Sequence, residues 1–417
     1  MKSNTIHIVG AGIVGLCTAW YLKKAGFRVT LIDAKDITDG TSFGNAGMIV
    51  PSHFVPMAAP GVISQGLKWM LNNKSPFYIK PRLNLDLVQW LWHFFQSANA
   101  QHVARSIPVL YELNEKSKAL YREMASEAGF AFGFQEKGLL MLYQTQKQAE
   151  EEEKLAEKAH KLGVTAEILD ANGLKKLEPE MDLEVLGGLY FPGDAHLYPN
   201  QLMVQLKAQL KHSGVTFLPN TAVVDFKCRA SKIEALVTDK NEVLSVKKVL
   251  LTTGSWSGLL LKKAGVKLHV QDGKGYSITL KNPVLRPRIP TLLSEAKVAV
   301  TPMGQNLRIG GTLEISGLSK KIDQQRIRGI LESVPKYYKN LTVPFDQETP
   351  IWQGYRPCTP DGMPYIGPSQ SFSNLFVGTG HGMMGLSLGA ITGKLLCELI
   401  TNEKPLIPMK PFRLERF

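Results

Sequence analysis

The sequence predicts an α/β protein that combines a Rossmann-type unit with a separate set of antiparallel strands. Three observations carry this prediction: a βαβ pattern over residues 5–34, alternating strand patterns over residues 215–252 and 275–313, and a strand, a glycine-rich turn and a helix over residues 374–400. A chain of 417 residues is long enough to bury a large core and to form two domains.

The first βαβ unit carries the glycine pattern of a dinucleotide site. An apolar strand, TIHIV, is followed by Gly10, Gly12 and Gly15 in a G-x-G-x-x-G array, then by a helical pattern and a second strand that ends at Asp33. Gly10 allows the tight turn, Gly12 lets a pyrophosphate approach the backbone, and Gly15 lets helix and strand pack closely. The helix N-terminus offers N–H groups to phosphates, and Asp33 is placed to accept hydrogen bonds from ribose hydroxyls.

The segment that follows favours FAD over NAD. An NAD dehydrogenase would normally continue with another regular α/β unit, whereas residues 40–61 are rich in small, hydrogen-bonding residues. The hydroxyls of Thr41 and Ser42 are further candidate donors to a pyrophosphate, and the glycine of NAG lets the chain pass close under a ring. The alternative interpretation is an ordinary glycine- and proline-containing loop.

Helices and strands alternate through the rest of the chain. Helical periodicity covers most of residues 62–135, a charged helix is expected over residues 146–162, and another helix begins at Pro199. A small β-meander and a buried strand are expected between residues 215 and 252, with further strands between residues 275 and 313.

Composition and charge limit the function classes. The chain is 44% hydrophobic and 20% charged, lacks an apolar run of membrane-spanning length, and has four scattered cysteines, which together predict a cytoplasmic protein with reduced thiols. Its net charge of +13 suits anionic substrates or an anionic membrane surface. Nucleic acid is not expected as a partner, because the lysines are spread along the chain rather than gathered in one arm.

Residues 353–368, QGYRPCTPDGMPYIGP, are predicted to form turns, because prolines and glycines leave little room for a helix or a long strand. Arg356 is the single cation in this stretch. It is either a solvated loop residue or a fixed fork that binds a carboxylate.

In their order, GAGIVG, TSFGNAG, TTGSWS, GYRPCTPDGMPYIG and GTGHGMMG resemble the FAD-dependent D-amino-acid oxidase superfamily, and within it the bacterial D-amino-acid dehydrogenases. The resemblance extends from end to end. It implies a discontinuous FAD-binding Rossmann domain of glutathione-reductase type at residues 1–52, 195–262 and 345–417. It also implies a substrate domain at residues 53–194 and 263–344, built on a mixed, largely antiparallel β-sheet that covers the flavin.

The resemblance also implies which residues bind FAD. Asp33 stands where most relatives have glutamate, so its reach to the adenosine ribose is shorter, and the backbone of Val223 is expected to read the adenine. Residues 382–387 are expected to contact the flavin from a helix N-terminus. Cys358 does not match the position of the covalent tether found in some relatives, so dissociable FAD is expected. The full expected set is Gly10, Gly12, Ile13, Val14, Gly15, Asp33, Ala34, Ser42, Asn45, Ala46, Gly47, Met48, Val223, Thr253, Gly254, Trp256, Gly354, His381, Gly382, Met383, Met384, Gly385, Leu386 and Ser387.

The resemblance assigns Arg356 to the substrate carboxylate, which it would bind as a bidentate fork. The hydroxyl of Tyr276 is expected to reach the substrate carboxylate or amine, with a half-buried core tyrosine as the alternative. His53 is a candidate at the edge of the pocket, although for His53, His196 and His381 a structural histidine is the better expectation. Hydride would pass from Cα to flavin N5, leaving an imino acid that water hydrolyses to a 2-oxo acid and ammonia.

The expected substrates are D-alanine-like acids, or D-proline and cis-4-hydroxy-D-proline, with a quinone or another respiratory acceptor. Residues 85–96 form a helical stretch with Trp90, Trp92, Phe94 and Phe95, preceded by four cations, which suits peripheral contact with an anionic membrane. These cations are Lys68, Lys74, Lys80 and Arg82. A core-facing helix is the alternative.

Two other functions remain open from the sequence. One is an oxidase for glycine or sarcosine that reduces O₂. The other is a flavoprotein subunit of a heteromeric amine dehydrogenase, which would need partner chains for activity.

Overall fold

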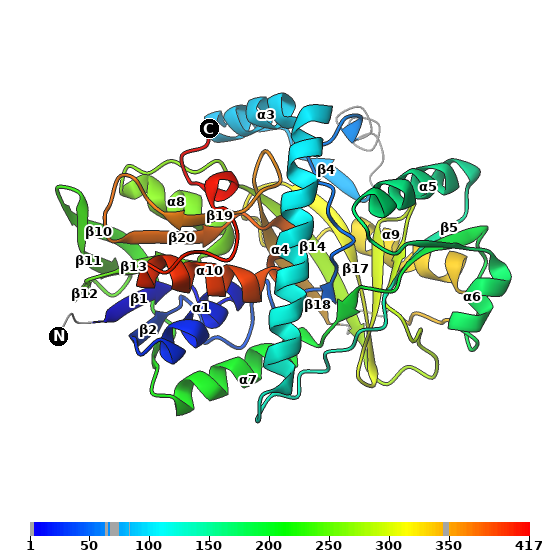
Figure 1. The fold of residues 1–417 in the computed structure, drawn as a ribbon, viewed down its shortest axis with the longest axis horizontal. Helices are drawn as coiled ribbons and strands as arrows, with labels where there is room; N and C mark the ends of the chain where they lie inside the picture. The colour runs from blue at the N-terminus through cyan, green and yellow to red at the C-terminus, as the bar shows by residue number, and fades with distance from the viewer. Residues whose placement is uncertain (1–3, 63–65, 67–74, 83, 345–349) are drawn as a thin grey trace.

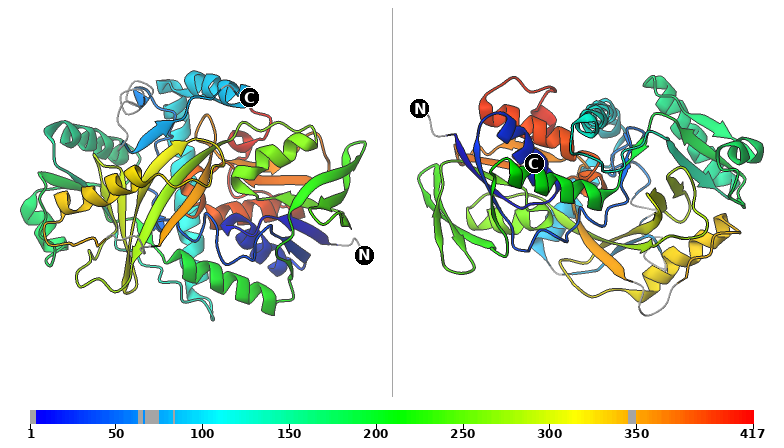
Figure 2. Two further views of the ribbon diagram at one scale, coloured as in Figure 1. Left: turned by 180° about the vertical axis from the view of Figure 1, so that it is seen from behind. Right: turned by 90° about the horizontal axis from the view of Figure 1, so that it is seen from below.

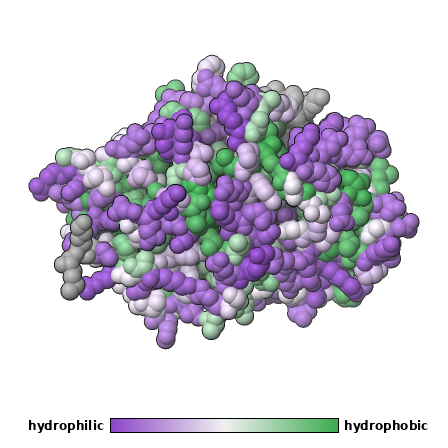
Figure 3. Space-filling view, viewed as in Figure 1, coloured by the Kyte–Doolittle hydropathy of each residue, from purple (hydrophilic) through white to green (hydrophobic). Residues whose placement is uncertain are grey.

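A computed structural model describes residues 4–62, 66, 75–82, 84–344 and 350–417. Figures 1 and 2 show two lobes, one around the N-terminal strand and one around the longest antiparallel strands, with helix α4 running across the front where the lobes meet. Hydrophilic residues predominate on the face drawn in Figure 3. Lys68 and Lys74, named above as candidate membrane contacts, lie outside the described residues.

The first lobe is built on a six-stranded sheet whose strands are parallel except at one edge. Its order is β19-β20-β13-β1-β2-β9, and β19 runs antiparallel to β20. The strands are β1 (Thr5–Val9), β2 (Arg28–Ile32), β9 (Thr216–Leu218), β13 (Val249–Leu251), β19 (Tyr365–Pro368) and β20 (Leu375–Thr379). The expected βαβ unit is confirmed, because β1 pairs in parallel with β2.

Three helices pack together in this lobe, with α1 in contact with both of the others. They are α1 (Ile13–Lys24), α7 (Pro199–His212) and α10 (Gly389–Thr401). A small antiparallel sheet of β10 (Val223–Arg229), β11 (Lys232–Thr238) and β12 (Val243–Ser245) matches the expected meander, and α8 (Ser257–Lys263) contacts β10.

The second lobe is built on a nine-stranded mixed sheet, most of whose pairs are antiparallel. Its order is β18-β14-β17-β16-β15-β5-β7-β6, and β4 pairs with β17. Its strands are β4 (Phe77–Ile79), β5 (Leu139–Tyr143), β6 (Glu167–Leu169), β7 (Gly187–Phe191), β14 (Gln271–Leu280), β15 (Thr291–Leu293), β16 (Val298–Met303), β17 (Asn306–Ile315) and β18 (Ile351–Cys358). Helices α5 (Gln146–Lys161), α6 (Ala171–Leu177) and α9 (Gln324–Tyr337) belong to this lobe. The expected α/β class with a mixed, largely antiparallel second sheet is confirmed.

Two further helices connect the lobes. Helix α3 (Leu85–Ser97) begins at its N-cap Asn84, and α4 (Ala100–Ser126) begins at its N-cap Asn99. Two side chains of α4 bind the segment before α10: the Ser117 hydroxyl donates to the Ser387 carbonyl at 2.5 Å, and the Tyr121 hydroxyl donates to the Leu386 carbonyl at 2.6 Å. The remaining short pair is β3 (Met48–Ile49) with β8 (Ala195–His196).

Two local predictions are wrong. The stretch with Arg356 is not a turn up to Cys358, because residues 351–358 form the eight-residue strand β18. The one proline in this strand, Pro357, is tolerated because β18 is an edge strand. The last helix begins at Gly389, so residues 382–387 precede it and include a 3₁₀ turn, Gly382–Gly385, instead of forming its N-terminus.

Strand β18 also joins the second sheet, although it lies within residues 345–417, which were assigned to the FAD domain. The domain boundaries stay a proposal.

One buried cation joins the second sheet to the loop that follows β2. Arg308 of β17 is 5% exposed, and its guanidinium donates to the carbonyls of Phe43 at 2.8 Å and Asn45 at 2.7 Å. It also donates to the Asn200 side chain at 2.9 Å and to the Thr279 hydroxyl at 3.0 Å. Because burial disfavours the charge, it lowers the pKa of Arg308 to about 10. The guanidinium therefore remains charged at neutral pH.

Replacing Arg308 by methionine should lower the free energy of unfolding by about 3 kcal/mol, because two buried carbonyls lose their donors. Urea denaturation followed by circular dichroism would measure the loss. Arg328→Met is the control, since Arg328 is an exposed arginine of the same lobe. An unchanged midpoint for Arg308→Met would contradict the assignment.

Candidate active site

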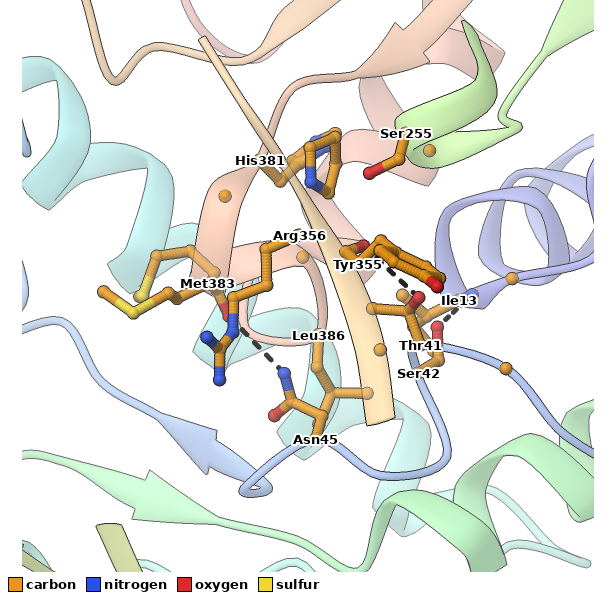
Figure 4. Close-up of a pocket in the computed structure, with 18 of the residues that line it drawn as sticks. Ile13, Thr41, Ser42, Asn45, Ser255, Tyr355, Arg356, His381, Met383 and Leu386 are labelled. Atoms are coloured by element: carbon orange, nitrogen blue, oxygen red, sulfur yellow. Dashed lines mark hydrogen bonds between the residues drawn. The ribbon is translucent and has the colours of Figure 1, made fainter. Parts of the chain in front are cut away.

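A cavity of about 1220 Å³ is lined by residues of both sheets. It is larger than the roughly 300–1,000 Å³ typical of drug-sized ligands. Its wall includes the glycine-rich turn after β1, the loop at residues 39–46, strand β18 and the segment at residues 381–386. Figure 4 shows side chains from these segments facing one another.

The glycine-rich turn leaves no room for side chains at two of its positions. Gly10 has φ of +102°, and a Cβ there would lie 2.5 Å from the carbonyl oxygen of Thr252. A Cβ on Gly15 would lie 2.0 Å from the carbonyl oxygen of Gly10. Gly15 does not line the cavity, so its part is the close packing of helix and strand. The N–H of Ile13 points to the Ser42 hydroxyl, its acceptor at 3.1 Å (Figure 4).

Asp33 holds the same turn from the end of β2. One carboxylate oxygen accepts from the N–H of Ala11 at 2.7 Å, and the other accepts from the N–H of Lys35 at 2.9 Å. Asp33 and Ala34 line the cavity, as does Val223 at the start of β10. The acid therefore lies beside the glycine-rich turn, at the end of the cavity where the sequence predicts adenosine.

The loop at residues 39–46 contacts both β18 and the segment at residues 381–386. The Thr41 hydroxyl donates to the Tyr355 carbonyl at 3.3 Å, and the Asn45 amide donates to the Met383 carbonyl at 3.4 Å (Figure 4). The ring of Trp352 lies so close that a Cβ on Gly44 would be 1.9 Å from it, and its Nε1 donates to the Gly40 carbonyl at 3.2 Å.

Arg356 projects from β18 across the neighbouring strand. A Cβ on Gly275 would lie 2.3 Å from the guanidinium carbon, so the guanidinium lies flat on the backbone of β14. It donates to the carbonyl of Thr312 on β17. In the described part of the chain no carboxylate forms an ion pair with Arg356, and burial lowers its pKa. The cation lines the cavity without a counter-ion.

Tyr276 also lines the cavity, but its hydroxyl is engaged elsewhere. It donates to the Glu314 carboxylate at 3.2 Å and accepts from the N–H of Asp323 at 3.3 Å. The ring belongs to the core of the second lobe, as the alternative interpretation expects. A contact of this hydroxyl with substrate stays a prediction.

Burial keeps the three candidate histidines neutral. It lowers the pKa of His53, His196 and His381 to about 4 each, and for His53 the charge of Lys297 adds to the effect. His381 lines the cavity, and its Nε2 lies 2.9 Å from the Thr392 hydroxyl. His53 lines it as well, whereas His196 is absent from its wall.

Most residues expected to bind FAD line this one cavity. Besides Gly10, Asp33, Ala34, Ser42, Asn45, Val223 and His381, the wall includes Gly12, Ile13, Val14, Ala46, Met48, Thr253, Gly254, Trp256, Gly354, Gly382, Met383, Met384, Gly385 and Leu386. Gly47 and Ser387 do not line it. The Ser387 hydroxyl instead donates to the Asn114 side chain at 3.1 Å, and a Cβ on Gly47 would lie 2.3 Å from the Leu197 carbonyl.

The sequence reasoning missed several residues of the wall. Thr252 closes the glycine-rich turn by donating to the Gly10 carbonyl at 2.7 Å, Trp352 covers the loop, and Lys297 adds a further cation. Only Trp352 had a local signal, since it lies two residues before a glycine of the Arg356 motif. In the parts of the chain described above, we find no cluster of side chains suited to a metal ion. None of the helices described is both long and apolar enough to cross a membrane.

Comparisons with known proteins bear on the family and the fold. A family model for FAD dependent oxidoreductases (DAO) matches residues 5–399. The chain is 33% identical over 409 residues to a D-amino acid dehydrogenase of Helicobacter pylori, covering 97% of each chain. It is 32% identical over 426 residues to a D-amino acid dehydrogenase of Granulibacter bethesdensis, covering 99% of each. Its fold is similar to that of glycine oxidase from Geobacillus kaustophilus, with a TM-score of 0.78, 22% identity, and coverage of 99% of this chain and 98% of that one.

The residues present fit FAD. No side chain covers the backbone at Gly10 and Gly12, and the N–H of Ile13 lies at the start of the first helix beside the Ser42 hydroxyl. This arrangement suits a pyrophosphate. The cavity continues from the adenosine end at Val223 to Arg356, so a dinucleotide bound along it would place its ring system near the unpaired cation.

Gly10→Ala should abolish FAD binding, because the new methyl group would overlap the Thr252 carbonyl. The ratio of flavin to protein absorbance after purification would measure this, and we expect a loss of most of the bound flavin. Gly26→Ala is the matched control: Gly26 also has positive φ, at +78°, but no atom lies within 4 Å of a Cβ there. Retention of flavin in Gly10→Ala would exclude this turn as the pyrophosphate site.

Proposed function

We propose that this chain, which belongs to the DAO family of FAD-dependent oxidoreductases, is a dehydrogenase for D-amino acids. Bound FAD would supply the acceptor of a hydride from the substrate Cα. The substrate would leave as an imino acid, or as a cyclic imine if it is D-proline or cis-4-hydroxy-D-proline. Water would hydrolyse an open-chain imino acid to a 2-oxo acid and ammonia.

The unpaired guanidinium of Arg356 is the observation that supports this proposal most directly. A partly buried cation that has no counter-ion among the described residues favours an anionic ligand, and a planar fork matches a carboxylate in two parallel hydrogen bonds. Because the guanidinium rests on Gly275 and is held by the Thr312 carbonyl, its direction is set before substrate arrives. The α-carboxylate would thus be fixed at one place, which limits how the Cα hydrogen can point.

Neutral histidines suit this chemistry. The imidazole of His53 lines the cavity, and its pKa of about 4 leaves it able to accept a hydrogen bond from the substrate amine. We propose His53 as a contact of the amine and Tyr276 as a support of the pocket wall through Glu314.

We propose that FAD is bound without a covalent link. Cys358, the cysteine nearest to Arg356 in the sequence, is buried, and its thiol donates to the Arg356 carbonyl at 3.4 Å. Burial raises the pKa of Cys358 to about 12, so the reactive thiolate is scarce at neutral pH.

The exposed face of helix α3 favours a quinone in a membrane as the acceptor of electrons from the reduced flavin. Its inner face, Leu87, Trp90 and Phe94, is buried, and the Trp90 indole donates to the Cys358 carbonyl at 2.9 Å. The outer face of α3 exposes five apolar residues: Leu85, Val88, Leu91, Trp92 and Phe95, of which Leu85 is 79% and Phe95 is 62% exposed. The core-facing interpretation therefore holds for one face only. An exposed apolar face of an amphipathic helix suits the boundary of a lipid bilayer.

Arg356→Lys should keep FAD and the fold but lower kcat/KM for a D-amino acid by roughly two to four decades, since the planar fork is lost. Arg356→Ala should be worse for amino acids and far milder for amines that lack the carboxylate. Anaerobic flavin reduction with a D-amino acid, its L-enantiomer and the amine analogue would measure these rates. Reduction of Arg356→Ala at the wild-type rate would reject the carboxylate site.

The Trp92→Ser/Phe95→Ser double variant should lose salt-dependent binding to anionic vesicles, together with the rapid reoxidation of reduced flavin by a vesicle-bound quinone. Val204→Ser is the matched control, because Val204 on α7 is 59% exposed and apolar but lies in the other lobe. Stopped-flow reoxidation would compare quinone with O₂. Fast reoxidation by O₂ alone would favour an oxidase instead.

A further inference from the structure

Lys297 is a further cation of the cavity wall, and no described residue neutralises it at close range. Lys297 lies in the turn between β15 and β16, and within the described ranges its ammonium has no hydrogen bond or ion pair. Other buried cations of this lobe are engaged. Lys274 donates to the Lys321 carbonyl at 2.8 Å, and Arg326 donates to the Ser75 carbonyl at 2.9 Å.

The acids near Lys297 have other partners. Glu295 accepts from the hydroxyls of Thr145 and Tyr337, at 2.9 and 2.5 Å. Glu152 is buried and accepts from the Gln148 amide at 2.9 Å. Both acids favour the charged form of Lys297 from beyond ion-pair distance, while burial, the larger effect, lowers its pKa. An anion in direct contact would therefore stabilise the charged form of the Lys297 ammonium.

The backbone of Lys297 and the guanidinium of Arg356 lie on opposite sides of the same part of β17. The Lys297 carbonyl lies 3.3 Å from where a Cβ on Gly311 would be, on the side of β16. The Arg356 guanidinium reaches the carbonyl of the next residue, Thr312, from the side of β14. Strands β16 and β14 lie on either side of β17, so they are two strand spacings, or about 9.6 Å, apart. The long lysine side chain can shorten this gap, so a small molecule with two anionic groups can approach both cations.

The cavity wall around Lys297 is otherwise uncharged. The nearest ionisable member of the wall, His53, is kept neutral by burial and by the charge of Lys297. The apolar members of this part of the wall are Met48, Val50, Met141, Leu155, Leu292 and Ala299. Such a wall suits methylene groups, and the Lys297 ammonium is available to bind a terminal anion.

We propose that Lys297 determines specificity by binding a carboxylate at the end of the substrate side chain, so that acidic D-amino acids of the D-glutamate class are preferred over their uncharged counterparts. The proposal rests on the proposed function, because Arg356 must bind the α-carboxylate for the side chain to extend toward Lys297. It adds a substrate class, which the carboxylate site alone does not specify.

The test compares D-glutamate with D-glutamine, which has the same shape without the charge, and uses D-alanine as a substrate with no side-chain anion. Lys297→Met should lower the ratio of kcat/KM for D-glutamate to that for D-glutamine by about 100-fold, with the main effect on KM. Lys297→Arg should retain most of the preference, because it keeps the charge. Lys281→Met, an exposed lysine outside the cavity wall, should behave like the wild type.

Ligand binding gives a second measurement that does not depend on turnover. Glutarate should perturb the flavin absorption spectrum of the wild type at concentrations well below those needed for pentanoate, and Lys297→Met should remove that difference. If the wild type oxidises none of D-glutamate, D-glutamine, D-alanine and D-proline, the proposed function fails, while the titration still tests Lys297. A D-glutamate to D-glutamine ratio that Lys297→Met leaves unchanged, or equal binding of glutarate and pentanoate to the wild type, would overturn the specificity role.

Discussion

The contact between Arg308 and the carbonyls of Phe43 and Asn45 is the constraint on which the site depends. Two sheets, assembled from segments that alternate along the chain, must face each other across a cavity, and the loop after β2 must lie between them. A guanidinium without a carboxylate partner needs several oxygens to replace its water, and the loop carbonyls provide two of them. The same contact positions Ser42 beside the first helix and Asn45 beside Met383.

The site also depends on glycines at three positions where two segments of the chain cross closely. At Gly10 the turn meets the Thr252 carbonyl, at Gly44 the loop meets the Trp352 ring, and at Gly275 strand β14 meets the Arg356 guanidinium. In each case a Cβ would overlap a neighbour, so the geometry of the cavity depends on the absence of side chains at these positions. The cavity is therefore shaped as much by backbone as by side chains.

Charge is distributed unevenly around this cavity. Most buried ionic groups of the second lobe are satisfied by one another, as Glu314 is by Tyr276 and Lys274, whereas Arg356 and Lys297 face the cavity without a close anion. The cavity histidines His53 and His381 are neutral, so they add no charge of their own beside these two cations. A low dielectric constant in the cavity strengthens the attraction of these two cations for an anionic ligand. The positive net charge of the whole chain attracts the same ligand from a longer distance.

Local pattern alone determined the βαβ unit, the glycine-rich turn, Asp33 at the end of β2 and the helix at residues 85–96, because each depends on residues close together in the sequence. The family resemblance placed Arg356 in the site but not on a strand. That position depends on pairing with β14, whose residues are some eighty positions away. Tyr276 points to Glu314, Trp352 covers Gly44, and Lys297 has no close anion, and each of these facts concerns neighbours that are distant in the sequence. Periodicity reveals which face of an element is apolar. Only the tertiary structure decides which buried charges find a partner, because the partners come from strands and loops that the chain brings together only by folding.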